Sequence, residues 1–320
     1  MRYIVGIDIG GTNIVVGVVA EDGSEVRGLV SEPTHVESGP DAIVGRITEL
    51  ARAARAQADR DVIGVGIGAP GPLDTKAGIV LLTPNLGWTN MPLRDRLAAA
   101  LGLRATLDND ANCAILGEWW RGAARGARHV VGLTIGTGIG GGIVLDGKIY
   151  HGASDVAGEI GHMTIDSTGR RCKCGNYGCL EAYASGPAIA ARAVEGIAAG
   201  ADTALPSYVD DNLSLITAQV VYEAAHDGDP FALEVVTDTA RFLGAGVANI
   251  VNIFNPEVVV VCGGVTLAGD RLFVPLRSEV KRRAFKPAVE VCRIVPGELP
   301  GTAGVVGAAA SFLQQTGQLG

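Results

Sequence analysis

The stretch Gly6-Ile-Asp-Ile-Gly-Gly-Thr12 begins as an apolar strand and ends in a glycine-rich turn beside a carboxylate, Asp8. A second stretch, Gly132-Leu-Thr-Ile-Gly-Thr-Gly138, repeats this pattern in the second half of the chain. Each is followed by another apolar run and an Asp-Gly turn, at Asp22-Gly23 and Asp146-Gly147, which is a strong hairpin signal. This internal echo indicates two related lobes that face each other.

Strands and helices alternate along the rest of the chain. Short apolar runs predict strands at residues 3–9, 13–20, 62–68, 130–135 and 258–261. Amphipathic periodicity predicts helices at residues 40–58, 92–101, 112–120, 187–199, 215–226 and 230–254. Residues 69–90 are rich in proline and glycine, and we expect a long functional loop there. The alternation indicates an α/β protein.

The composition excludes several classes of protein. A hydrophobic content of 48% with 19% charged residues is typical of a compact globular chain. The net charge of −8 argues against a nucleic-acid partner, because its phosphates would be repelled. The first apolar stretch is too short for a signal peptide, and the uncharged stretch 130–145 is shorter than a bilayer requires. We therefore expect a cytoplasmic protein that has no membrane partner.

Three thiols and an imidazole come close together in the sequence. The run Cys-Lys-Cys-Gly-Asn-Tyr-Gly-Cys-Leu-Glu occupies residues 172–181, ten residues behind Glu159-Ile-Gly-His162. Tetrahedral zinc takes thiolate sulfur and imidazole nitrogen, and a set of three cysteines and one histidine fills all four positions of a structural site. The alternatives are a disulfide or three unrelated thiols. The proposed ligands are His162, Cys172, Cys174 and Cys179.

The glycine-rich turns predict phosphate binding, since no side chain blocks their backbone N–H groups. The segment Gly136-Thr-Gly-Ile-Gly-Gly141 matches the dinucleotide pattern, but it returns into a strand instead of opening a helix. Two strand–turn–strand loops on facing lobes suit a nucleotide held in a cleft. Thr12 and Thr137 would offer hydroxyls to the terminal phosphates, and Asp8 would hold Mg²⁺ through its water shell. The alternative is a pair of tight hairpins without a ligand.

Three motifs together resemble the ROK family of sugar kinases. They are Asp8-Ile-Gly-Gly-Thr12, Leu107-Asp-Asn-Asp-Ala-Asn112, and Glu159-Ile-Gly-His162 with the cysteine run that ends at Glu181. The resemblance implies the two-lobed, actin-like and hexokinase-like ATPase fold, whose lobes are ribonuclease H-like and enclose a cleft. It implies a small domain at residues 1–109, with a helix at about 304–317 packed back on it, and a large domain at 110–303 that carries the zinc-binding loop. One departure is Asn13, where family members often have lysine.

The resemblance also implies an activity, the ATP-dependent phosphorylation of D-glucose at its 6-hydroxyl. A sugar hydroxyl is a poor nucleophile, so a carboxylate must accept its proton, and Asp110 is the candidate for this base. Asp110 alone would otherwise be read as a helix N-cap. Asn109, Glu159, His162 and Glu181 would bind the sugar hydroxyls. The nucleotide, as Mg-ATP, would contact Asp8, Gly10, Gly11, Thr12, Asn13, Thr137, Gly138, Gly263 and Gly264.

Other functions stay open within and beyond this class. The acceptor could be N-acetylglucosamine, N-acetylmannosamine, mannose or fructose, because one sequence does not show the geometry around the sugar 2-position. ROK members include sugar-responsive repressors, which carry a helix-turn-helix ahead of the kinase-like region. Here the phosphate loop already arrives at Asp8, which disfavours a repressor. The resemblance implies a homodimer or homotetramer.

Overall fold

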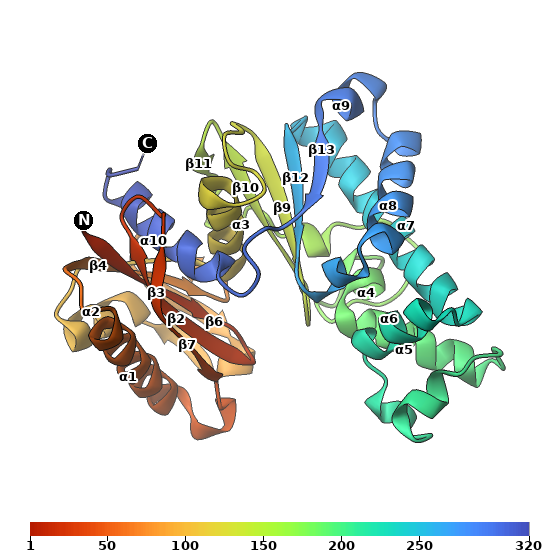
Figure 1. The fold of residues 1–320 in the computed structure, drawn as a ribbon, viewed down its shortest axis with the longest axis horizontal. Coiled ribbons are helices and arrows are strands. Elements are labelled where there is room, and N and C mark those ends of the chain that lie inside the picture. Colours follow the sequence, from red (N-terminus) through yellow and green to blue (C-terminus); the bar gives the residue numbers. More distant parts are fainter. Residues whose placement is uncertain (320) are drawn as a thin grey trace. The chain divides into compact units, whose positions relative to one another are not determined.

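The structure is a computed structural model in which residues 1–319 are described (Figure 1). The chain forms two compact units. The first comprises residues 1–130 and 142–158 and the segment from residue 298 onward, and the second comprises residues 131–141 and 159–297. The sequence predicts a small domain at residues 1–109 and a large domain at 110–303, and these limits stay a prediction.

A five-stranded sheet with the order β3-β2-β1-β4-β8 forms the centre of the first unit. Strand β1 pairs antiparallel with β2 and parallel with β4, and β4 pairs parallel with β8. Strands β1 and β2 have the predicted bounds. The five strands are β1 (Tyr3–Ile9), β2 (Asn13–Ala20), β3 (Val26–Pro33), β4 (Val62–Ala69) and β8 (Ala105–Asn109).

Helices of the first unit pack against this sheet and against one another. Helix α1 (Pro40–Ala58) contacts β2 and β3 and buries the apolar stripe that its periodicity predicts. Helix α10 (Ala303–Gln315) contacts β1, β4, β8 and helix α3 (Asp110–Arg121). Gly66 permits this packing, because a Cβ atom there would lie 1.9 Å from the carbonyl oxygen of Ala308. The remaining long helix of the unit is α2 (Leu93–Leu101).

The segment predicted as a long loop at residues 69–90 is not a simple loop. It contains a three-stranded sheet of β5 (Leu73–Asp74), β6 (Ile79–Thr83) and β7 (Trp88–Met91), in which Val80 pairs with Met91. Val80 and Trp88 are buried in the core of the unit. The prediction failed because proline and glycine mark the turns of this small sheet and hide its short apolar runs.

The second five-stranded sheet has the order β11-β10-β9-β12-β13, and the boundary between the units falls within β10, at residues 141 and 142. Strands β12 and β13 pair in parallel. The predicted strands at 130–135 and 258–261 are confirmed. The strands are β9 (Val130–Ile135), β10 (Ile139–Leu145), β11 (Lys148–Ile149), β12 (Val258–Cys262) and β13 (Arg293–Pro296).

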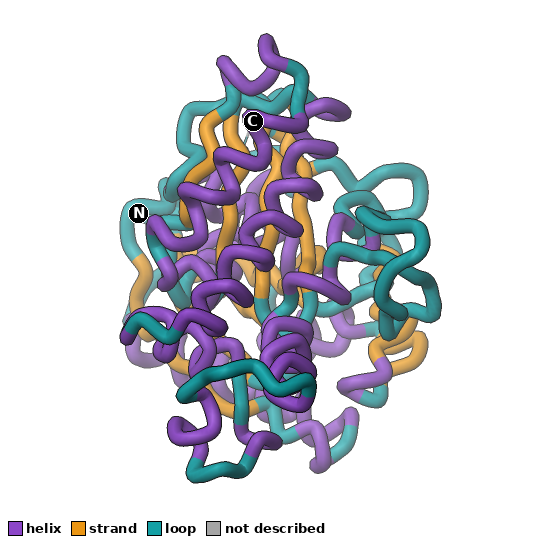
Figure 2. Tube along the Cα trace, turned by 90° about the vertical axis from the view of Figure 1, so that its right-hand side faces the viewer, coloured by secondary structure: helices purple, strands orange, loops and turns teal. Residues whose placement is uncertain are grey.

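Helices make up most of the second unit, and Figure 2 shows them packed side by side in front of its strands. Helix α7 has the predicted bounds and contacts α6 and α8. Helix α8 was not predicted: the sequence analysis assigns no element between the turn at Gly263 and the helix expected at about 304–317. The helices are α4 (Glu181–Ala184), α5 (Gly186–Ala198), α6 (Ala218–Asp227), α7 (Pro230–Phe254), α8 (Asp270–Arg283) and α9 (Lys286–Val291).

Short 3-10 helices connect several of these elements. They are η1 (Val36–Ser38), η2 (Pro84–Leu86), η3 (Ile160–His162), η4 (Leu205–Val209), η5 (Leu213–Leu215) and η6 (Gly264–Ala268). Among the helices of residues 1–319, none combines the length and the apolar character that crossing a membrane requires.

Candidate active site and metal cluster

The first glycine-rich turn joins β1 to β2, as the sequence predicts. Its backbone is closed by a hydrogen bond of 2.8 Å from the Gly10 N–H to the Asn13 carbonyl oxygen. The hydroxyl of Thr34 also donates to the Gly10 carbonyl oxygen at 2.8 Å, which fixes the turn from outside. Gly11 and Thr12 are exposed at its tip, and a Cβ atom at Gly11 would meet no other atom within 4 Å. The turn therefore has room for an anionic ligand against its backbone.

Asp8 lies at the end of β1 and shares its surroundings with a second carboxylate. Burial raises the pKa of Asp8 to about 7, and the negative charge of Asp110 adds to this effect. Helix α10 comes close on the other side, since a Cβ atom at Gly304 would lie 2.1 Å from Oδ2 of Asp8. A buried carboxylate close to a second negative charge forms a place where a divalent cation would be stabilised.

Asp110 is the first residue of α3, directly after the end of β8. The N-cap of this helix is Asn109, whose Oδ1 accepts hydrogen bonds from the N–H groups of Ala111 at 3.0 Å and Asn112 at 3.1 Å. Oδ1 of Asp110 accepts a further bond of 2.8 Å from the Ala111 N–H. The capping role thus belongs to Asn109, which uses its amide oxygen for the cap and keeps its amide nitrogen as a possible donor.

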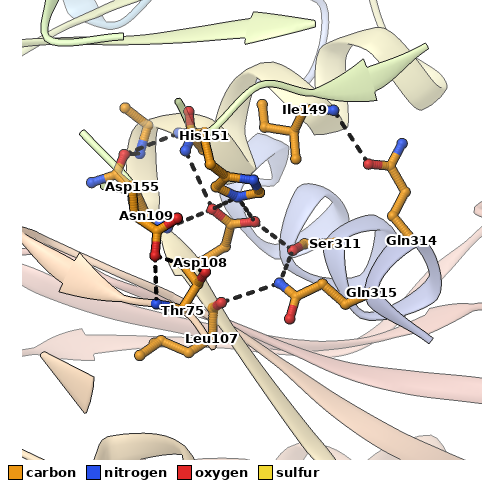
Figure 3. Close-up of polar contacts among 12 residues, drawn as sticks. Thr75, Leu107, Asp108, Asn109, Ile149, His151, Asp155, Ser311, Gln314 and Gln315 are labelled. Carbon is orange, nitrogen blue, oxygen red and sulfur yellow. Dashed lines mark hydrogen bonds and ion pairs between the residues drawn. The ribbon is translucent and has the colours of Figure 1, made fainter. Parts of the chain in front are cut away.

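Asp108 lies near the end of β8, directly before Asn109. Only 1% of it is exposed, and its carboxylate lies at the centre of a polar network with Asn109, His151 and Ser311 (Figure 3). Sequence reasoning missed the partners because His151 and Ser311 lie 43 and 203 residues away along the chain. A signal was present in the run Asp108-Asn-Asp110. A helix cap at Asn109 and a base at Asp110 explain two of these polar residues and leave Asp108 without a role.

The second glycine-rich turn, between β9 and β10, is linked to a predicted sugar ligand of the same unit. The Gly136 N–H donates to the Gly138 carbonyl oxygen at 2.9 Å and closes the turn. Oε2 of Glu181 accepts a hydrogen bond of 2.9 Å from the Ile139 N–H. A Cβ atom at Gly138 would lie 2.6 Å from the same carboxylate oxygen, so the glycine makes room for Glu181. Thr137 is exposed beside them.

The four proposed metal ligands converge in the second unit. The ligand atoms of His162, Cys172, Cys174 and Cys179 all lie within 4.8 Å of one another. The sulfur atoms of Cys174 and Cys179 are 3.7 Å apart, and Sγ of Cys172 lies 3.8 Å from Nδ1 of His162. Around a tetrahedral ion with bonds of about 2.3 Å, neighbouring sulfur atoms lie about 3.8 Å apart. The donor set and its spacing therefore fit zinc, and all the cysteines are free thiols in the structure.

The surroundings of the cluster support the same interpretation. Burial raises the pKa of Cys179 to about 12, so this thiol needs a nearby cation to become a thiolate. Gly178 has a φ of +71°, and a Cβ atom there would lie 1.6 Å from the Asp166 carbonyl oxygen. Nδ1 of His162 faces Cys172, whereas its Nε2 lies 3.9 Å from Oε2 of Glu159. One ring nitrogen thus points to the cluster, and the other points to Glu159, a predicted sugar ligand.

A cavity of about 670 Å³ opens in the second unit beside the second glycine-rich turn. It is lined by Gly136 and Gly264, together with side chains from α6, η4, η6 and α8. Gly263, with a φ of +103°, allows the turn after β12 to lie close to the end of β9. A Cβ atom there would lie 2.0 Å from the Ile135 carbonyl oxygen. The volume of this cavity matches that of pockets that hold small-molecule ligands. The lining side chains that sequence reasoning missed include Tyr208, Tyr222, Glu223 and Arg271.

Comparison with known proteins identifies the class. The sequence pattern of the ROK family matches residues 4–315, and the chain belongs to this family. A glucokinase from Halalkalibacterium halodurans is 38% identical over 98% of this chain and 96% of its own. A ROK family glucokinase from Streptomyces griseus, solved with glucose and AMPPNP, has a TM-score of 0.85 and 36% identity over 97% of this chain and 98% of that one.

A third relative belongs to the regulatory branch. A putative xylose repressor from Caldicellulosiruptor is 37% identical over 83% of this chain, which corresponds to 66% of the repressor. The solved neighbours, which include a ROK hexokinase from Thermus thermophilus, confirm the predicted fold class. The chain has the two-lobed α/β fold of ROK sugar kinases.

Proposed function

We propose that this protein is a glucokinase, which transfers the γ-phosphoryl group of ATP to the 6-hydroxyl of D-glucose. The observation that carries the proposal is the pairing of Asp8 with Asp110 in one unit, where burial and mutual repulsion raise the pKa of Asp8 to about 7. Two such carboxylates are stabilised by a cation, and Mg-ATP brings one. The similarity of the whole chain to glucokinases supports the same activity.

In the proposed reaction, Asp110 accepts the proton of the sugar 6-hydroxyl as the hydroxyl oxygen attacks the γ-phosphorus. The new oxygen–phosphorus bond forms as the bond to the bridging oxygen of ADP breaks, and ADP leaves with that electron pair. Mg²⁺, when bound with ATP, neutralises charge on the phosphates, and Asp8 would hold it through water. The phosphate loops at Gly10–Asn13 and Thr137–Gly138 would position the nucleotide.

The sugar contacts that we propose come from Asn109, Glu159, His162 and Glu181. The amide oxygen of Asn109 caps its helix, and its amide nitrogen can donate to a hydroxyl oxygen. Carboxylates and an imidazole nitrogen satisfy hydroxyls with directed hydrogen bonds. Zinc on His162, Cys172, Cys174 and Cys179 would be structural, because the protein fills all four positions. The metal would fix the ring of His162 in one orientation.

The adenosine moiety would occupy the cavity of about 670 Å³ beside Gly136 and Gly264. Bare backbone at Gly263 and Gly264 would let the nucleoside lie close to the chain. We further propose a cytoplasmic homodimer or homotetramer without a nucleic-acid partner. The family resemblance supports the assembly, and the net charge of −8 disfavours binding to nucleic acid.

A sugar panel tests the proposal. ADP formation is coupled to a spectrophotometric readout with glucose, mannose, fructose, N-acetylglucosamine or N-acetylmannosamine as acceptor, and with Mg-ATP or polyphosphate as donor. We expect the highest kcat/KM for glucose with ATP. A clear preference for another hexose would replace the acceptor within the same class. No sugar-dependent ADP formation, together with a sugar-responsive shift of DNA in a gel, would favour the repressor instead.

A further inference from the structure

The buried carboxylate of Asp108 has a place in the fold that the proposed chemistry does not explain. It lies one residue before Asn109 and two before Asp110, and only 1% of it is exposed. An ionised carboxylate is costly to bury unless it is paired and hydrogen-bonded. Its partners therefore indicate what the residue does.

Four segments of the first unit bring donors to this carboxylate. Oδ1 accepts from the Asn109 N–H at 2.8 Å and from the Asn112 side chain at 3.3 Å. Oδ2 accepts from the Ser311 hydroxyl, on α10, at 2.7 Å. Nε2 of His151 lies 3.0 Å from each of the two oxygens (Figure 3). Among these partners, His151 is the one that can carry a positive charge.

The segment that carries His151 is held at a second point. Oδ2 of Asp155 accepts hydrogen bonds from the Thr75 N–H at 2.8 Å and from its hydroxyl at 2.9 Å. Asp155 has a φ of +59°, a left-handed conformation that is uncommon outside glycine. The segment that carries His151 is thus held at two points, at Asp108 and at Thr75 in the turn between β5 and β6.

We propose that His151 is a positioning residue for phosphoryl transfer: through Asp108 it holds the corner between β8 and α3 on which Asn109 and Asp110 stand. The inference rests on the function proposed above for Asp110. Asp108 fixes the peptide N–H of Asn109, and Asn109 in turn caps the helix that begins with Asp110. Without a cation at position 151, Asp108 would be a buried unpaired charge and its hold on this peptide would weaken.

The charges around His151 favour its protonated form. The hydrogen bond to Asp108 raises the pKa of His151 above its usual 6.5, and the charges of Asp108 and Asp155 add to this. Cys113, the thiol of α3 near Asp108, has a pKa raised well above 9.0 by burial and stays neutral. The positive charge of His151 is therefore fully present below pH 6.5 and is lost as the pH rises through its raised pKa.

The test compares the kinetics of His151→Gln with those of wild type. Glutamine retains a hydrogen-bond donor and loses the charge, and His151 is partly exposed, with 23% of its side chain accessible. We expect kcat to fall by about 10- to 100-fold, because a displacement of the base by about 1 Å has this effect. The KM for Mg-ATP should change by less than about twofold, since the phosphate loops are untouched. In wild type, deprotonation of His151 should lower kcat at alkaline pH. This alkaline limb of the pH profile should be absent in His151→Gln.

A matched control is His129→Gln. His129 also lies near an aspartate, Asp146, at 3.8 Å, but this pair is exposed. We expect its kcat and pH profile to equal those of wild type. The double variant Asp108→Asn/His151→Gln removes the buried charge with its partner, and it should recover part of the kcat lost in His151→Gln.

Wild-type protein gives a readout that needs no variant. Nitrogen-15 NMR of the imidazole groups would follow the protonation of His151, and its pKa should coincide with the alkaline limb of kcat. The inference is overturned if the two midpoints differ by more than about one pH unit, or if His151→Gln keeps a kcat within twofold of wild type. Failure of the proposed function would look different, because wild type itself would then form no ADP with glucose.

Discussion

Oε2 of Glu181 accepts a hydrogen bond from the Ile139 N–H at 2.9 Å, while Oε1 of the same carboxylate lies 4.0 Å from Sγ of Cys172. One side chain thus touches the second glycine-rich turn with one oxygen and the cysteine cluster with the other. Glu181 is also a predicted sugar ligand. We infer that it links three parts of the second unit: the phosphate loop, the metal cluster and the sugar contacts.

Substitution of Glu181 should separate its roles. Glutamine keeps a carbonyl oxygen that can accept from Ile139, so Glu181→Gln should raise the KM for glucose several-fold and change the KM for Mg-ATP by less than about twofold. Glu181→Ala also frees the turn, so it should raise both KM values, that for glucose by about 10-fold or more. Steady-state kinetics with each substrate varied in turn would measure this. An unchanged KM for glucose in both variants would remove Glu181 from the sugar site.

Removal of the charge of Asp8 should change stability in a pH-dependent manner. The folded-state pKa of about 7 lies above the usual 3.8 of an aspartate, so the folded protein binds this proton more tightly than the unfolded chain does. Its contribution to stability is therefore present below pH 3.8 and is lost as the pH rises to about 7.

Asp8→Asn should accordingly be more stable than wild type at pH 8 and similar to it at pH 4, although its activity should be low. The shift of about 3 pKa units sets an upper limit of about 4 kcal/mol on the difference. Urea unfolding at both pH values, without Mg-ATP, would measure it. Equal free energies of unfolding for wild type and Asp8→Asn at pH 8 would show that the surroundings of Asp8 do not disfavour its ionised form.

Loss of one cluster ligand should remove the metal with little loss of packing. Cys174 is exposed, whereas Cys172 and Cys179 are buried, so Cys174→Ser is the mildest substitution of a thiol ligand. We expect about one zinc per chain in wild type and much less in this variant, with a lower Tm and a higher KM for glucose because His162 loses its fixed orientation.

Cys292→Ser is the matched control, because Cys292 is a partly buried free thiol outside the cluster. Its zinc content, measured by mass spectrometry of the intact metalloprotein, should equal that of wild type. Fully active wild-type protein without zinc would contradict the structural role of the metal.

The sequence predicts those parts of the fold that local patterns determine. The hairpin of β1 and β2 and the helix α7 have the predicted bounds, because alternation and helical periodicity are strong over their length. The small sheet at residues 73–91 was missed, since its strands are short and separated by turn residues. The cysteine cluster was predictable because all four ligands lie within 18 residues of sequence.

The remainder of the site depends on contacts between distant segments. Asp108 meets Ser311 across 203 residues, and no local pattern reports such a contact. The cavity beside Gly264 joins β9 to α6 and η6, whose side chains carry no motif. Burial is the largest cause of the raised pKa of Asp8, and α10, from the other end of the sequence, packs against this side chain at Gly304.

Turnover by Asp110→Ala tests the central claim most directly. ADP formation with Mg-ATP and glucose would be measured for wild type and for this variant, with circular dichroism to confirm that both are folded. We predict that kcat falls by about 10²- to 10⁴-fold, the contribution of a general base, while the KM for Mg-ATP stays within about threefold of wild type. A folded Asp110→Ala protein that turns over glucose within tenfold of the wild-type rate would contradict the account.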